Sequence, residues 1–400
     1  MRFIEETWSS EKLGNLCKIT MGQSPSSKNY SKNSNDTILI QGNANLISGK
    51  IVPRIYTSEI TKLSYPGDII LTVRAPVGDL AINEFDSCIG RGVCSFKGNK
   101  FIYYYLESLK DKHVWERLSQ GSTFESVNSN DIKNLNLKIP SNSTQNHIIN
   151  FFTAIDTKIE LLQKKHGEYI RFKQYLMQNI FADKSAEKLR FADSDSCWKE
   201  ISLKDIGTFY RGHSYNSTNV ADEGLLVLRS NNIQGNVLDF SEDGLQFVDK
   251  DCKKELELQK NDIVICMSNG TRRLVGKSAE YTGNYENKVT VGAFCSIFRT
   301  ENKLAKYLFQ TESYKKNLYL ILAGTNINNL KNSDLEKFKF NIPTNESEIN
   351  KIHDLFVSID NKIDYNKKQL EEITLFKKGL LQQMFVVQLI LSLLQNKKHI

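Results

Sequence analysis

The chain has 400 residues, of which 40% are hydrophobic and 25% charged, and its formal net charge is +7. This length exceeds what one hydrophobic core normally supports, so we expect at least two domains, and the basic charge fits a phosphate-binding surface without requiring one. The seven cysteines include no C-x-x-C pair, which argues against a disulfide framework or a zinc knuckle and favours the reducing cytoplasm.

Neither end of the sequence carries an export or membrane signal. Residues 1–10 are charged and lack the apolar stretch of a secretory signal. The longest apolar run, Met384 to Leu394, is interrupted by Gln388 and Ser392 and is shorter than the roughly 20 residues of a membrane span. We therefore expect no membrane segment.

The first elements of the chain recur in its second half. Arg2-Phe3 returns as Arg190-Phe191, and Trp8 returns as Trp198. A spaced set follows with constant intervals, in which Leu13, Leu16, Ile19, Gly22 and Ser24 return as Leu203, Ile206, Phe209, Gly212 and Ser214. Such self-similarity is the signature of an internal repeat.

Short strands and a helix are expected next in each half. Asp68 to Val73 and Asp262 to Met267 are β-rich runs after turn signals, and residues 103–118 and 304–322 have helical spacing. The remaining matches pair Val77-Gly78 with Val275-Gly276, Cys94-Ser95 with Cys295-Ser296, Gly121-Ser122 with Gly324-Thr325, and Ile139-Pro140 with Ile342-Pro343. We therefore expect each half to form a strand-rich, mixed α/β domain, so that the chain as a whole is α+β. The insertions that distinguish the two copies should lie in loops.

Each half then ends in a long helical segment. Ile155-Asp-Thr-Lys-Ile159 recurs as Ile359-Asp-Asn-Lys-Ile363, and Phe172-Lys173 recurs as Phe376-Lys377. Apolar residues at alternating three- and four-residue steps indicate a coiled-coil seam, and a helix of some 30 residues is roughly 45 Å long. The seam residues are Phe152, Ile155, Ile159, Leu162, Tyr169 and Leu176 in the first helix and Phe356, Ile359, Ile363, Leu370, Ile373 and Leu380 in the second.

Polar residues interrupt both seams, namely His166 and Lys173 in the first and Asn366 and Lys377 in the second. For the lysines, we favour the interpretation that the aliphatic stems lie along the edge of the seam while the ammonium groups reach water. The alternative is that polar positions fix register and partner choice. For Asn366 both interpretations stay open.

No motif indicates a catalytic or metal site. Val275-Gly276-Lys277-Ser278 resembles the end of a phosphate-binding loop, but five residues instead of four separate Gly270 from Gly276, and the first half has Asp79 in place of the lysine. Gly90-Arg91-Gly92 lacks the third glycine of a dinucleotide fingerprint. The six histidines lack metal-ligand spacing, and neither a nucleophile elbow nor an adenine-methylase N-P-P-Y tetrad is found.

The repeated helix, which ends in the residues from Phe376 to Phe385, resembles a conserved region of the specificity subunits of type I restriction-modification enzymes. The segments Leu203 to Gly207 and Gly324 to Pro343 carry the same resemblance, which covers nearly the whole chain. It implies two tandem target-recognition domains, each reading one half of a bipartite DNA site, and two long helices that pack as an antiparallel coiled coil and set the half-site separation.

The resemblance also implies partners that supply the chemistry. Two methyltransferase subunits would methylate adenine with S-adenosylmethionine, and motor-nuclease subunits would use ATP and Mg²⁺. This chain would hold no catalytic residue, cofactor or metal. Because the helices and strands are duplicated closely and the loops are not, the expected DNA target is asymmetric.

We therefore expect five segments. They are residues 1–146 (target-recognition domain 1), 147–184 (spacer helix 1), 185–349 (linker and target-recognition domain 2), 350–385 (spacer helix 2) and 386–400 (an apolar tail with no counterpart after Phe181). The tail could be an extended helix, a partner contact or the product of an altered C-terminus.

DNA contacts are expected in loops beside turns that follow the repeated strands, because Arg suits bidentate reading of guanine and Asn or Gln that of adenine. In the first domain they are Gln23, Ser24, Lys28, Gln41, Asn43, Arg74, Arg91 and Thr123. In the second they are Arg211, His213, Tyr215, Arg229, Asn231, Asn269, Arg272, Arg273 and Asn326.

Two other functional classes fit the same sequence less well. One is a coiled-coil adaptor whose globular halves bind proteins and not DNA. The other is a fused methyltransferase or nuclease with its own active site, against which the missing methylase motifs argue.

Overall fold

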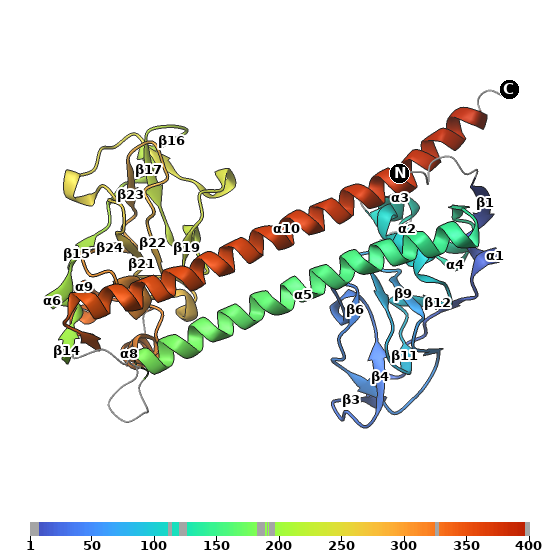
Figure 1. Ribbon diagram of the computed structural model, residues 1–400, viewed down its shortest axis with the longest axis horizontal. Helices are drawn as coiled ribbons and strands as arrows, with labels where there is room; N and C mark the ends of the chain where they lie inside the picture. The colour runs from blue at the N-terminus through green and yellow to red at the C-terminus, as the bar shows by residue number, and fades with distance from the viewer. Residues whose placement is uncertain are drawn as a thin grey trace. The chain divides into compact units, whose positions relative to one another are not determined.

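The computed structural model describes residues 8–110, 114–119, 126–181, 189, 191, 197–324 and 328–396, and at residues 116, 117, 119 and 386–396 it describes the backbone alone (Figure 1). The chain divides into two compact units. Unit 1 comprises Met1–Lys164 and Lys367–Ile400, and unit 2 comprises Lys165–Asn366. Each unit thus contains one half of each long helix, α5 (Asn142–Ile180) and α10 (Glu346–Asn396).

Unit 1 contains two sheets and a short ribbon. The first sheet has the order β2 (Ile19–Met21), β12 (Val93–Phe96), β9 (Ile69–Thr72), β10 (Leu80–Ile82), β6 (Lys50–Ile51) and β5 (Leu46–Ile47). The second has the order β3 (Tyr30–Ser31), β7 (Tyr56–Thr57), β4 (Thr37–Ile40), β11 (Ser87–Ile89) and β8 (Leu63–Ser64). The antiparallel ribbon joins β1 (Ser9–Lys12) to β13 (Asn136–Ile139), and the short helices are α1 (Leu13–Leu16), α2 (Lys100–Lys110), α3 (Val114–Ser119) and α4 (Ser129–Lys133).

Unit 2 repeats this topology. Its sheets have the orders β15 (Thr208–Arg211), β24 (Cys295–Arg299), β21 (Ile263–Cys266), β22 (Ser278–Glu280) and β16 (Val220–Ala221), β20 (Phe247–Val248), β17 (Leu225–Leu228), β23 (Val289–Val291). Two ribbons pair β14 (Trp198–Ser202) with β25 (Lys339–Pro343) and β18 (Ile233–Gln234) with β19 (Val237–Leu238). The short helices are α6 (Leu203–Ile206), α7 (Ala305–Leu308), α8 (Glu312–Ala323) and α9 (Asn332–Leu335). The predicted internal repeat is therefore confirmed.

The central strands of the two units correspond residue by residue, and this corrects one alignment made from the sequence. In both β9 and β21 every residue is buried, as expected of short apolar runs covered on both faces. Val93 pairs with Thr72, the last residue of β9, and Cys295 pairs with Cys266, the last residue of β21. Val93 is therefore the counterpart of Cys295, and the alignment of Cys94 with Cys295 is wrong by one residue.

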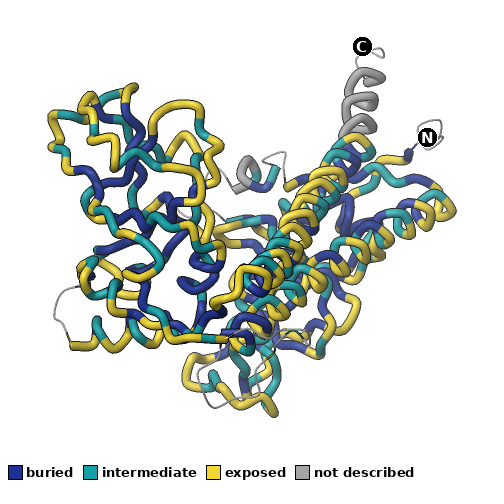
Figure 2. The backbone as a smooth tube through the Cα atoms, turned by 60° about the vertical axis from the view of Figure 1, so that its left-hand side comes forward, coloured by how far each residue is buried: buried dark blue, intermediate teal, exposed yellow. Residues whose placement is uncertain are grey.

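The long helices run antiparallel within each unit. In unit 1, Phe152 of α5 packs near Phe385 of α10, and four residues further along α5 Asp156 bonds Lys377, which precedes Phe385. In unit 2, Phe181 stacks on Phe356 at 6.0 Å. The predicted seam residues are buried or half-buried in their units. Figure 2 shows buried segments in dark blue that are joined by exposed segments in yellow.

Aromatic side chains fix the helix pair of unit 1 to its sheet domain. Phe385 is fully buried and lies 5.5 Å from the ring of Phe101 and 4.9 Å from that of Tyr105, both on α2. Trp8 lies 6.1 Å from the same ring. In unit 2, Tyr307 of α7 stacks on Phe356 of α10 with 4.6 Å between the ring centroids. Each core therefore combines one domain with halves of both long helices.

The interpretation of the seam lysines as solvent-reaching edge residues is wrong. The side chain of Lys377 is 11% exposed, and its Nζ lies 2.8 Å from Glu107 Oε2 and 2.8 Å from Asp156 Oδ1. Lys173 is 17% exposed, with its Nζ 2.7 Å from Asp360 Oδ1. Both ammonium groups are held between a domain and the neighbouring long helix, because a carboxylate faces each of them.

The helix α10 continues through Asn396, so the backbone of residues 386–396 extends the second long helix. In the described part of the chain, no helix combines the length and the apolar character that a membrane span requires.

Candidate nucleic-acid interface

In each unit the ends of several strands meet at one place. In unit 1, Gly90 N donates to Ile40 O (2.8 Å), Gln23 N donates to Ile89 O (2.9 Å) and Val73 N donates to Gly92 O (2.9 Å). The loops after β2, β4, β9 and β11 therefore lie side by side. We call residues 22–24, 41–43, 73–74 and 90–92 loop junction 1.

Unit 2 builds the corresponding loop junction 2 from residues 211–215, 229–231, 267–273 and 292–294. His213 N donates to Val291 O (2.7 Å), Gly292 N to Leu228 O (2.8 Å) and Met267 N to Phe294 O (2.8 Å). Each of these three bonds joins backbone positions equivalent to those joined by one of the three bonds in unit 1. The two junctions therefore share one backbone scaffold.

The repeated glycines Gly22 and Gly212 are required by this scaffold. A Cβ on Gly22 would lie 2.1 Å from Gly90 O, and a Cβ on Gly212 would lie 2.2 Å from Gly292 O. Neighbouring backbone atoms cannot yield to a side chain as a flexible neighbour can. The repeated sequence thus has glycine at two positions where the strand ends cross too closely for a side chain.

Loop junction 1 brings together most of the residues expected in the first domain. Gln41 Nε2 donates to Tyr30 Oη (2.6 Å), which leaves the second amide hydrogen and the Oε1 atom for another partner. Ser24 Oγ accepts from Arg91 N (3.1 Å), and Arg74 follows Val73 on the other side of Gly92. Gln23, Asn43, Arg74 and Arg91 are exposed.

Lys28 lies apart from these hydrogen-bonded crossings, in the 3-10 turn Ser27–Asn29. It is near Glu59, whose pKa is lowered, mainly by the hydrogen bond from Asn29, then by that from Ser26 N, and less by the charge of Lys28. Lys28 therefore already has a carboxylate neighbour.

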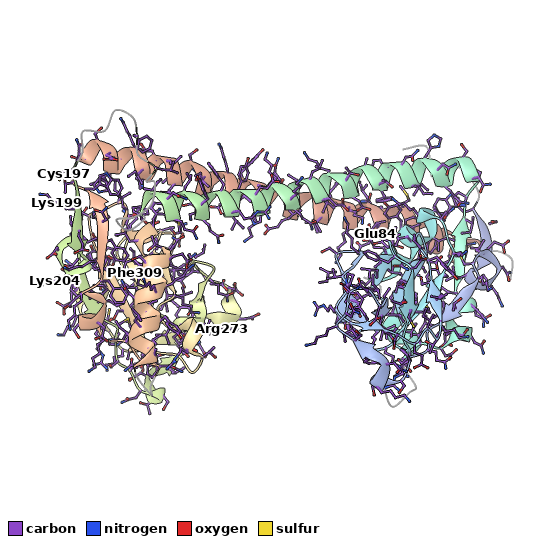
Figure 3. The ribbon with its side chains drawn as sticks, turned by 90° about the horizontal axis from the view of Figure 1, so that it is seen from below. Glu84, Cys197, Lys199, Lys204, Arg273 and Phe309 are labelled. Carbon is purple, nitrogen blue, oxygen red and sulfur yellow. The ribbon has the colours of Figure 1, made fainter. Side chains whose placement is uncertain are left out.

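Loop junction 2 gathers the residues expected in the second domain. Asn269 Nδ2 donates to Ser230 Oγ (3.1 Å), and Arg272 Nε donates to Asn328 Oδ1 (3.3 Å). Arg211, Asn231 and Arg273 are exposed, and Figure 3 shows Arg273 projecting from its loop. Tyr215 lies beside Gly292, because a Cβ atom added to Gly292 would be 3.8 Å from Cε1 of the Tyr215 ring. Thr123 and Asn326 lie outside the described residues.

Two side chains of loop junction 2 have buried polar atoms without a partner in the described chain, His213 Nε2 and Arg229 Nε. Burial, and to a lesser degree the charge of Lys250, lowers the pKa of His213, so the imidazole is neutral at neutral pH. A buried donor or acceptor without a partner costs free energy.

The structure adds two residues that the sequence did not indicate. Asn328 bonds both Arg272 and the carbonyl of Gly270, and thereby shapes the loop 269–273. Phe294 is 70% exposed at the turn between β23 and β24. The exposure of a phenylalanine cannot be predicted from a single sequence. The position of Phe294 between two repeated strands does predict that it lies in a loop.

Metal and disulfide chemistry have no support in the described residues. They contain no group of three or more His, Cys, Asp or Glu suited to a metal ion, and all seven cysteines are free. Lys277, the lysine of the P-loop-like stretch, donates to Ile233 O (2.8 Å). It therefore serves the packing of β18.

Comparisons with known proteins agree with this architecture. Residues 5–168 and 195–375 match the family model described as type I restriction modification DNA specificity domain. The putative type I restriction enzyme MjaX specificity subunit of Methanocaldococcus jannaschii is 35% identical over 191 residues, which are 45% of this chain and 44% of the relative. The StySPI specificity subunit of Salmonella potsdam is 30% identical over 44% of this chain and 39% of its own length. These matches span less than half of either relative.

Two solved structures share the fold. The S subunit of a type I restriction-modification system from M. genitalium superposes with a TM-score of 0.60 at 18% identity, covering 95% of this chain and 96% of that one. A chain from a study of complex assembly and conformational transition in the type I R-M system gives 0.55 at 17% identity, covering 95% and 97%.

Proposed function

Because the chain belongs to the family of type I restriction modification DNA specificity domains, we propose that it is the DNA-recognition subunit of a type I restriction-modification complex. In this proposal residues 1–146 and 185–349 carry the two target-recognition domains, and the segments 147–184 and 350–385 act as spacers. The chain itself recognises DNA, and partner subunits perform the chemistry.

The observation that carries this proposal is the pair of loop junctions. Their backbones share the same hydrogen bonds, yet Gln23 corresponds to His213 and Gln41 to Arg229. Such side chains contact phosphates and base edges, and different side chains on one scaffold read different bases. The proposed DNA site is therefore bipartite and asymmetric, with one half-site for each domain.

The long helices offer surfaces for partner subunits. Phe172 and Phe376 occupy equivalent positions of the repeat and both are exposed, as are the equivalent Leu161 and Tyr365. The recurrence of exposed apolar side chains at equivalent positions of both copies supports our proposal of two equivalent binding surfaces. We assign them to two methyltransferase subunits, to which motor-nuclease subunits are added. Co-purification should return two methyltransferase subunits for each recognition chain.

The adenine methylome of a host with and without this gene tests the proposal directly. Loss of one methylated motif with two specific halves around a fixed spacer would support it. An unchanged methylome, together with no DNA affinity of the assembled complex, would contradict DNA recognition and favour an adaptor.

A charge variant tests the role of loop junction 2. Arg272→Ala with Arg273→Ala should weaken DNA binding by the assembled complex and reduce the slope of log affinity against log salt by about 0.9 for each phosphate that the variant no longer neutralises. Lys199→Ala with Lys204→Ala is the matched control, because it removes the same charge from the opposite side of unit 2 (Figure 3). Equal slopes for both variants would refute the assignment.

A further inference from the structure

Phe294 is an exposed aromatic residue held on a rigid turn within loop junction 2. Cys295 N donates to Gly292 O (2.8 Å) and closes the turn, while Met267 N (2.8 Å) and Ser268 N (3.2 Å) both donate to Phe294 O. The backbone is thus fixed from two sides, but 70% of the residue remains exposed. A fixed position with an unburied phenyl ring suggests a contact that the chain alone does not supply.

The first domain has no equivalent of this side chain. Val73 N donates to Gly92 O as Met267 N does to Phe294 O, so Gly92 is the structural counterpart of Phe294. A Cβ on Gly92 would lie 2.0 Å from Gln41 O, which excludes any side chain there. The phenyl ring is therefore specific to the second half of the repeat.

The neighbours of Phe294 are suited to nucleic acid. The turn lies between the loop that starts at Arg229 and the loop 267–273, since Gly292 N donates to Leu228 O and Phe294 O accepts from Met267 and Ser268. These loops supply Arg229, with its unpaired Nε, and Arg272 and Arg273. An apolar ring on a turn whose adjoining loops carry cationic groups fits a ligand that is anionic at its rim and has an apolar feature inside.

We propose that Phe294 contacts the 5-methyl group of a thymine in the half-site read by the second domain. This inference rests on the proposed DNA-recognition function. The thymine methyl is the apolar group that base pairs present in the major groove, and phenylalanine is among the side chains that contact it. Phe294 then adds an apolar reading to the polar readings of Arg229 and His213, and the first domain, with Gly92, has no such contact.

The test replaces single thymines by uracil, which removes the methyl group and keeps base pairing. Once the methylated motif is known, duplexes carrying one uracil at each position of both half-sites are titrated with the assembled complex. Burial of a group of this size is worth about 0.8 kcal/mol, which corresponds to about fourfold in affinity. The unaltered complex should lose about fourfold at one position in one half-site.

Phe294→Ala should bind the thymine duplex more weakly and should no longer distinguish uracil from thymine at that position, whereas Phe294→Leu should keep part of the discrimination. Tyr319→Ala, which alters an aromatic residue of similar exposure (69%) on α8, should keep all of it. Phe294 is exposed enough that its removal should leave thermal unfolding unchanged.

Two results would overturn the inference. One is an unchanged effect of uracil in Phe294→Ala. The other is an equal loss of affinity of Phe294→Ala for every DNA sequence. That result would indicate that the ring inserts between base pairs or makes another contact without base preference. Failure of the unaltered complex to bind its motif would instead refute the proposed function itself.

Discussion

Lys377 and Lys173 show how single residues join each domain to both long helices. In unit 1, Tyr104 Oη donates to Asp156 Oδ2 (2.7 Å), and Lys377 lies over the Tyr104 ring (5.4 Å) while it bonds Asp156 and Glu107. Burial opposes the charge of Lys377, but the two carboxylates outweigh it and raise the pKa of the ammonium group. The residue therefore stays charged in the core.

The equivalent cluster of unit 2 has one carboxylate fewer. Lys173 bonds Asp360, and Gln310 Oε1 accepts at 3.2 Å at the position that Glu107 occupies in unit 1. The Asp and the Lys both belong to the repeated helix motifs, one from each helix. The motifs that identified the repeat thus meet in space.

Substitutions in these clusters should rank by the number of carboxylates left without a partner. Lys377→Met should destabilise unit 1 by somewhat less than the ~3–5 kcal/mol of a fully buried pair, because Glu107 and Asp156 keep part of their solvent contact. Lys173→Met should cost less, and Glu107→Gln, which copies unit 2, should stay within about 1 kcal/mol. Hydrogen exchange followed separately in the two units measures each effect. An equal cost for Glu107→Gln and Lys377→Met would contradict the ranking.

At the scale of elements, periodicity in the sequence predicted the strands β9 and β21, the helical regions that contain α2 and α8, and both long helices, because buried apolar runs and heptads have clear periods. It did not predict the pairing register of β24, since a Cys-Ser pair occurs in both halves but one residue out of register. It also misplaced the seam lysines, because the carboxylate Glu107 that holds Lys377 lies 270 residues away in the chain.

The candidate interface was predictable only in outline. Position after repeated strands indicated Gln23 and Gln41, which the strand crossings bring together in loop junction 1, and Arg229 and Asn269, which they bring together in loop junction 2. The hydrogen bonds that bring these loops together depend on tertiary contacts that no local pattern carries. The exposure of Phe294 has the same origin, since a phenylalanine in a sequence is expected inside a core.

The crossing of strand ends predicts a sharp difference between two glycines of loop junction 2. Gly212→Ala places a methyl group 2.2 Å from Gly292 O, and the resulting displacement should cost about 1–3 kcal/mol and disturb His213. Gly270→Ala meets no atom within 4 Å and should be tolerated. In the methylome, Gly212→Ala should relax one half of the motif and leave the other unchanged. Loss of both halves, or equal effects of the two variants, would contradict this role for the junction.

At the scale of the whole molecule, neither compact unit is built from one domain alone. Unit 1 is completed by residues 367–400, whose side chains Leu380, Leu381 and Phe385 are buried in the core that contains Trp8 and Phe152. Unit 2 is continuous from Lys165 to Asn366 and already holds its halves of both helices. The two recognition domains therefore depend on the C-terminal helix in different ways.

Removal of the C-terminal segment should consequently destroy the N-terminal domain. A chain that ends at Asn366 lacks Lys377 and Phe385, which leaves Glu107 and Asp156 without their lysine and opens the aromatic core around Phe101. Unit 1 should lose protection in hydrogen exchange while unit 2 keeps it. In the full chain, Phe385→Ala should have the same direction at about 3–5 kcal/mol, since its ring is fully buried. A chain ending at Phe385 is the matched control and should keep both units protected. If unit 2 opened first in the shorter chain, the C-terminal half of α10 would not be part of the first domain's core.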